Sequence, residues 1–215
     1  MVTAIASLQA EIGAELARLK EALPAPTGQR ISTTLAKQFQ FPDGRLSAEP
    51  FEAILLDWRW VNTLYSSAYH PEQRVPPDCW AIAPSPERLV AAVDCAQPQH
   101  ASCRDCPKNQ FGSAGRGKAC KNGIRLALIP PEPTPETVPW TLTISPTGIK
   151  PFLAYTHPLL QVWGKLPIQM ITRIGFNPKA AYPTLLFQCL AEHEQLELAF
   201  HLKAAAQPTL DREFD

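Results

Sequence analysis

Residues 54–62 have the sequence Ile-Leu-Leu-Asp-Trp-Arg-Trp-Val-Asn, and they indicate the class of fold. Aromatic and branched apolar residues of this kind favour β-strands, and a strand places alternate side chains on opposite faces. One face of the predicted strand carries four large apolar side chains: Ile54, Leu56, Trp58 and Trp60. The opposite face carries Asp57, Arg59 and Val61.

Further short strands are predicted on the C-terminal side of this stretch, at residues 79–82, 126–129, 140–144, 169–176 and 183–188. Helices are predicted at residues 149–162, with Pro158 as a break or kink, and at residues 191–205. Five prolines between residues 130 and 139 predict a stiff, extended connector. The expected class is α+β, with a small mixed or antiparallel barrel or sheet that is compatible with an oligonucleotide-binding barrel and carries a zinc-knuckle insertion.

An amphipathic helix is predicted at residues 3–23, because apolar residues recur there every three or four positions and prolines follow at 24 and 26. Its apolar stripe would dock on its own domain or on a second copy of the chain, which would make a homo-oligomer. The expected organisation is a helix at 1–24, a core at 25–206 that contains the knuckle at 79–125, and an acidic tail at 207–215.

The charge of the chain is balanced overall but uneven along its length. The 215 residues include 20 basic and 20 acidic side chains, which argues against a protein that coats polyanions. The segment 100–125 nevertheless holds six basic residues against one acid, Asp105, and the segment 181–215 is acidic. Because no leader pattern and no apolar run of about 20 residues is present, we expect a cytoplasmic protein without a membrane span, in the host cytoplasm if a phage encodes it.

Cysteine spacing predicts a structural zinc (Zn²⁺) site. Cys103 and Cys106 form a Cys-x2-Cys turn, and Cys120 follows after thirteen intervening residues. The spacing leaves three candidates for the fourth ligand: Cys79, Cys95 and His100. Four protein ligands leave no coordination position for substrate, so the ion would be structural. The sixth cysteine, Cys189, lies in an apolar run and is predicted to be a buried thiol.

No motif in the sequence supports an enzyme. Residues 112–118 match a phosphate-binding loop, but Ala119 stands where serine or threonine would bind magnesium, and no apolar strand precedes the motif. The five histidines have no nucleophile or paired carboxylate at a recognisable spacing. The glycines of this loop are expected to allow sharp turns, so that Arg116 and Lys118 project as a basic tip.

Three motifs together resemble a group of small phage and mobile-element proteins that carry a zinc knuckle: Pro76-Pro-Asp-Cys79-Trp-Ala, Cys103-x2-Cys106-Pro-x-Asn109-x-Phe111-Gly-Ser, and Gly117-Lys-Ala-Cys120-Lys-Asn. The likeness extends over most of residues 45–190. In that group the cysteine of the Pro-Pro-x-Cys element accompanies the knuckle, so the resemblance implies Cys79 as the fourth ligand. A looser similarity of layout links the chain to phage single-stranded DNA-binding proteins, some of which carry a zinc insertion on an oligonucleotide-binding barrel.

Basic and aromatic residues around the knuckle predict binding to single-stranded nucleic acid, DNA or RNA. The resemblance implies a role in phage or mobile-element replication or recombination. Such proteins screen phosphates with cations and stack bases on aromatic rings. The predicted contacts are Arg59, Trp60, Lys108, Phe111, Arg116, Lys118, Lys121 and Arg125. The acidic tail is either an ordinary disordered terminus or, as its resemblance to the tails of single-strand-binding proteins implies, a segment that binds replication proteins. The alternative is a zinc-stabilised adaptor that presents the knuckle to an acidic protein surface.

Overall fold

The computed structural model describes residues 29–66 and 75–211. The helix expected at residues 3–23 and the last four residues of the expected tail lie outside the described residues. Within the described ranges, no helix combines the length and the apolar character needed to cross a membrane.

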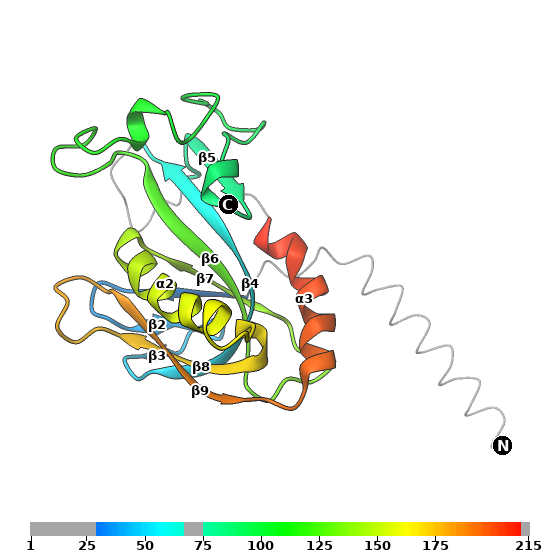
Figure 1. The fold of residues 1–215 in the computed structure, drawn as a ribbon. Coiled ribbons are helices and arrows are strands. Elements are labelled where there is room, and N and C mark those ends of the chain that lie inside the picture. Colours follow the sequence, from blue (N-terminus) through cyan, green and yellow to red (C-terminus); the bar gives the residue numbers. More distant parts are fainter. Residues whose placement is uncertain (1–28, 67–74, 212–215) are drawn as a thin grey trace, which may run out of the picture.

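In the described part of the chain, nine strands form one curled, mixed sheet, so the fold is α+β (Figure 1). The strand order is β3-β2-β1-β7-β6-β4-β8-β9, and β5 pairs with β4 beside this path. Among the pairs that the described residues form, only β1 and β7 run parallel, and the others are antiparallel. The strands are β1 (Gln29–Thr33), β2 (Phe39–Gln40), β3 (Leu46–Ser47), β4 (Phe51–Leu64), β5 (Cys79–Ala83), β6 (Lys121–Ile129), β7 (Trp140–Ile144), β8 (Met170–Phe176) and β9 (Leu185–Glu192).

Two helices cover opposite faces of the sheet. Helix α2 (Pro146–Gln161) packs Phe152 and Leu159 into a core that includes Leu126 of β6. Helix α3 (Leu196–Leu210) packs Leu202 into a second core that includes Ala127, the next residue of β6. Since consecutive strand residues point to opposite faces, the central strands are buried on both sides.

A β-bulge in β4 corrects the predicted faces of that strand. The pairing of β4 with β6 shifts register between Leu55 and Asp57. Ile54 and Leu56 lie in the core under α3, as one alternating set. Trp58 and Trp60 instead pack against the core under α2, because the extra residue of a bulge moves all later side chains to the other face.

The predicted strands are confirmed, although several boundaries shift. Three short features were not predicted as strands: β1, β2 and β3, which are two to five residues long. Pro158 does not end α2, which continues to Gln161. Strand β9 extends to Glu192, so α3 begins and ends later than the predicted helix. The expected tail boundary at residue 207 therefore falls inside α3.

Candidate metal centre and adjoining groove

The cysteine-rich segment lies between β5 and β6, at the end of β4 that projects from the sheet (Figure 1). Leu64 of β4 pairs with Cys79 of β5, and the neighbouring Thr63 pairs with Lys121 of β6. Cys120 immediately precedes β6. The two partner strands thus bring Cys79 and Cys120 to the same end of β4, although 40 residues separate them in the sequence.

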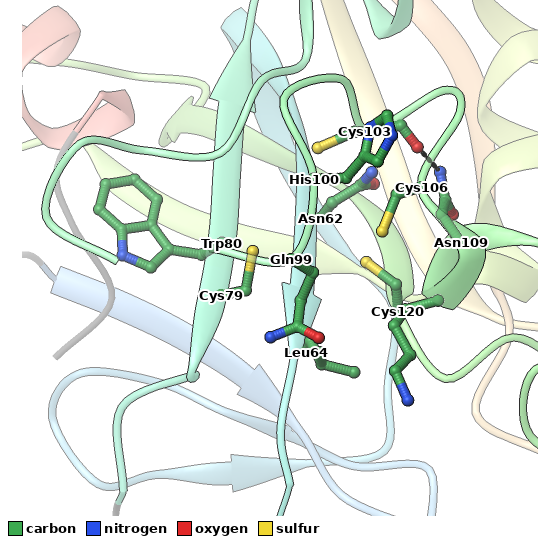
Figure 2. Close-up of a pocket in the computed structure, with 11 residues that line it drawn as sticks. Asn62, Leu64, Cys79, Trp80, Gln99, His100, Cys103, Cys106, Asn109 and Cys120 are labelled. Atoms are coloured by element: carbon green, nitrogen blue, oxygen red, sulfur yellow. Dashed lines mark hydrogen bonds between the residues drawn. The ribbon is translucent and has the colours of Figure 1, made fainter. Parts of the chain in front are cut away.

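Four cysteines line one small cavity between the strands and the knuckle: Cys79, Cys103, Cys106 and Cys120. Figure 2 shows their sulfur atoms arranged around this space. The cavity volume of about 10 Å³ is close to that of a single water-sized sphere, so the space suits one ion and excludes an organic ligand. Among the described residues, no three His, Cys, Asp or Glu side chains already form a metal-binding group, so the thiols would have to draw together around an ion.

Three thiols of the cluster hold their protons tightly. Burial, together with the neighbouring cysteines, raises the pKa of Cys103 to about 11 and the pKa of Cys120 to about 12. Burial also raises the pKa of Cys79. At neutral pH the thiols of Cys79, Cys103 and Cys120 are therefore protonated. A divalent cation among the sulfur atoms would reverse this preference, because it stabilises the thiolates that bind it.

The remaining ligand candidates differ in their surroundings. The Cys95 sulfur accepts a hydrogen bond from the Trp80 amide at 3.1 Å and donates one to the Trp80 carbonyl at 3.2 Å. Cys95 does not line the cavity, whereas His100 does. The His100 Nδ1 faces the Ser102 amide at 3.1 Å, and the residue is exposed. The structure therefore groups Cys79 and His100, but not Cys95, with the knuckle thiols.

A network of side-chain amides joins the knuckle to β4 and β6. Asn122 donates to Asn62 at 2.6 Å and to Asn109 at 2.9 Å. Asn109 in turn donates to the Cys103 carbonyl at 2.7 Å. Lys118 donates to the Oδ1 atoms of Asn109 and Asn122, at 3.3 and 3.1 Å. These contacts fix the position of Cys103 relative to the sheet. Asn109 and Asn122 stand in the cysteine motifs, but no sequence pattern indicated their partner Asn62.

A second, larger hollow adjoins the small cavity. This groove has a volume of about 470 Å³, within the usual range of about 300–1,000 Å³ for small-molecule sites. Trp60 and Asn62 line it from β4, and Arg104 and Lys118 line it from the knuckle. Three residues line both spaces and so form the wall between them: Asn62, Cys103 and Asn109.

The loop from Lys108 to Lys121 exposes four of the eight predicted contact residues. Phe111 is 82% exposed, and both lysines at the loop ends and Arg116 are exposed. Gly112 and Gly115 have φ angles of 92° and 59°, which glycine adopts without strain. Lys118 differs from the expected basic tip, because its Nζ turns inward to the amide network and lies 5.1 Å from the centre of the Phe111 ring.

Two predicted contact residues, Arg59 and Arg125, do not join this surface. The Arg59 Nε lies 2.7 Å from Asp211, and a second nitrogen donates to Gln207. Arg125 is 7% exposed and donates to the Leu210 carbonyl at 3.0 Å. Both arginines point to the α3 side of the sheet, as the bulge in β4 and the pairing of Arg59 with Arg125 require. Their contacts anchor the C-terminal end of α3.

Arg104 was not among the predicted nucleic-acid contacts, yet it is exposed and lines the groove. Its place directly after Cys103 was the only signal in the sequence. Comparison with known proteins adds no assignment, since no protein-family model, curated protein or solved structure matches this chain.

Proposed function

We propose that the chain is a single-stranded nucleic-acid-binding protein whose knuckle is stabilised by one structural zinc ion. The observation that carries the proposal is the groove, in which an aromatic side chain, Trp60, and two cations, Arg104 and Lys118, line one space beside the exposed loop. Aromatic rings stack on bases and cations neutralise phosphates, and these are the two forces that such proteins combine. The curled sheet is compatible with an oligonucleotide-binding barrel.

Zinc is the ion that suits the cavity best. Cysteine thiolates are ligands for zinc, and four of them complete a tetrahedral shell without a place for water or substrate. Cys79, Cys103, Cys106 and Cys120 supply this set. Zn–S bonds of about 2.3 Å would draw the four sulfur atoms together, and the charge of the ion would offset the desolvation that raises the thiol pKa values.

Metal analysis tests the zinc part of the proposal. The purified protein should contain one zinc per chain, and Cys106→Ser should lose most of it. Cys189→Ser is the matched control, because Cys189 lies on β9 outside the cavity and its replacement should leave the zinc content unchanged. Zinc-free wild-type protein, or equal loss in both variants, would show that the cluster is not a metal site.

An oligonucleotide titration tests the binding part. The protein should bind a single-stranded oligonucleotide at low salt, and log K should fall with log salt concentration by about 0.7 for each phosphate contact. Arg116→Ala should reduce this slope by about 0.7, because Arg116 is exposed between two glycines at the loop tip. If the protein did not bind the oligonucleotide at low salt, the proposed function would be wrong.

The second candidate function is a protein-interaction adaptor. The 82% exposure of Phe111 favours it, since an exposed aromatic ring beside cations also fits an acidic protein surface. An adaptor would show no salt-dependent oligonucleotide binding, so the same titration separates the two functions.

A further inference from the structure

The groove is lined by chemically different parts of the chain. Trp60 comes from β4, and Pro86, Glu87 and Leu89 come from the segment that follows β5. The knuckle contributes Arg104 and Lys118. Cations and an aromatic ring in one groove match the two parts of a nucleotide: its charged phosphate and its flat base.

We infer that this groove is a subsite for one unpaired nucleotide, whose base stacks on Trp60 while its phosphate contacts Lys118 and Arg104. The inference rests on the proposed function and deepens it, since it places the base in a defined pocket rather than on the exposed loop. The volume of about 470 Å³ accommodates a single nucleotide and excludes a duplex.

Lys118 is already held in position for a phosphate. An ammonium group has three donors, and in the described part of the chain two of them contact Asn109 and Asn122. The same Nζ lies 5.1 Å from the centre of the Phe111 ring, and Lys118 lines the groove, so a phosphate that enters would meet an ammonium group with one donor left after these two amide contacts. Because the side chain is fixed before binding, contact with a phosphate costs less conformational entropy than contact with a free lysine would.

Trp60 is also fixed before a ligand binds. Its ring is half-buried and packs against two apolar clusters, the main core under α2 and the small cluster of Ala81, Ala83, Leu89 and Cys103. The part that lines the groove is therefore a rigid platform. Base stacking on such a platform tolerates any base, because every base has an aromatic face.

Glu87 would help to orient a bound nucleotide in the groove. Glu87 lines the groove from the segment that follows β5, and its carboxylate would repel a phosphate beside it. A phosphate would therefore favour the part of the lining that the knuckle contributes, with Arg104 and Lys118. Glu87→Gln should then strengthen oligonucleotide binding. If the substitution acted by damaging the structure, it would weaken binding instead.

Tryptophan fluorescence of the full chain, titrated with a twelve-residue oligo-dT, tests the inference. Binding should quench the fluorescence of the wild-type protein and of Trp163→Phe, a control whose side chain is 58% exposed beyond the end of α2. Trp60→Phe should show most of the quenching removed. Trp60→Leu should bind about tenfold more weakly, as expected for the loss of one stacked base.

Arg104 and Glu87 are exposed, so their variants test the groove even if the Trp60 variants fail to fold. Arg104→Gln should reduce the salt slope by about 0.7, and Glu87→Gln should raise affinity. Suppose that Trp60→Leu and Arg104→Gln bind as tightly as wild type while Arg116→Ala binds more weakly. This result would overturn the groove assignment but leave the proposed function standing. No oligonucleotide binding by the wild-type protein would overturn both. Quenching by an acidic peptide but not by oligo-dT would likewise overturn both in favour of an adaptor.

Discussion

Arg59 and Arg116 illustrate at the scale of single residues how the environment of a charge assigns its role. Arg59 has a side chain that is 13% exposed and ion pairs to Asp211 at 2.7 Å and Asp57 at 3.5 Å. Arg116 is exposed at the tip of the knuckle loop. A partly buried, paired guanidinium contributes to stability, whereas an exposed one at a convex tip is available to a ligand.

The variant Arg59→Ala should therefore lower the free energy of unfolding by about 1–3 kcal/mol, because it leaves Asp211 and Gln207 without their shared donor. Urea denaturation measures this change. Arg116→Ala is the matched control and should change the free energy of unfolding by less than about 0.5 kcal/mol. A salt slope for oligonucleotide binding that falls in Arg59→Ala would contradict the assignment of this arginine to α3.

The burial of the Tyr155 hydroxyl group predicts that the protein loses stability at high pH. Its hydroxyl group forms a buried hydrogen bond with Thr172, and burial raises the pKa of Tyr155 to about 12. The unfolded chain loses this proton near pH 10, so the folded state binds more protons than the unfolded state between about pH 10 and 12. Stability should then fall as pH rises through this window.

The measurement compares wild-type protein with Tyr155→Phe by urea denaturation at pH 9 and pH 11.5. Other groups titrate in both proteins, so the difference between the two slopes isolates Tyr155. Wild-type protein should lose about 1–2 kcal/mol more than the variant over this range. Equal losses would show that the tyrosine ionises as readily in the folded state as in the unfolded state.

At the scale of elements, β6 passes close to β7 at Gly123. A Cβ atom at this position would lie 2.7 Å from the Ile144 carbonyl oxygen and 3.3 Å from a Val61 methyl group. The Ile144 carbonyl belongs to a strand that is paired with β6, so it cannot shift without disturbing that pairing. Gly123→Ala should therefore destabilise the fold by about 1–3 kcal/mol, as overpacked cores do.

Gly117→Ala provides the control for this prediction. The nearest atom to its added Cβ would be 3.7 Å away, an ordinary contact, and the residue lies in the knuckle loop. Thermal denaturation should show a clearly lower Tm for Gly123→Ala and little change for Gly117→Ala. A similar Tm for both variants would mean that β6 and β7 can separate at no cost.

The elements differ in how well local sequence predicts them. Strand β4 has strong β propensity, so its existence followed from local sequence, but the faces of Trp58 and Trp60 depend on the bulge after Leu55. No local pattern marks that bulge. Strands β2 and β3 have two residues each and exist only through pairing with neighbours, which a single stretch of sequence does not encode.

At the scale of the whole molecule, the candidate site joins parts of the chain that the sequence separates. The convergence of Cys79 with Cys103, Cys106 and Cys120 was predictable from motif spacing and resemblance. The groove was not, because Trp60 and Asn62 reach it only after β5 and β6 pair on either side of β4. Long-range strand pairing, rather than any local motif, creates the surface for which we propose a ligand.

The knuckle and the sheet should differ in their dependence on metal. The two main cores contain many large buried side chains from the sheet and its helices. The apolar cluster at the knuckle contains only Ala81, Ala83, Leu89 and Cys103, with Trp60 packed against it. So small a cluster cannot offset the conformational entropy of about 35 ordered residues, and an ion shared by four ligands would supply the missing stability.

Removal of metal with a strong zinc chelator should therefore loosen residues 84–120 and leave the sheet folded. Hydrogen exchange followed by mass spectrometry measures this: exchange in peptides from the knuckle should accelerate by at least about tenfold, equivalent to about 1.4 kcal/mol of local stability. Peptides from β7 and β8 should keep their protection, because the two main cores do not involve the cavity. Cys106→Ser should show the same pattern without chelator, and Cys189→Ser should resemble wild type. Unchanged exchange in the knuckle would refute a structural ion, and loss of protection throughout would show that the knuckle and sheet fold as one cooperative unit.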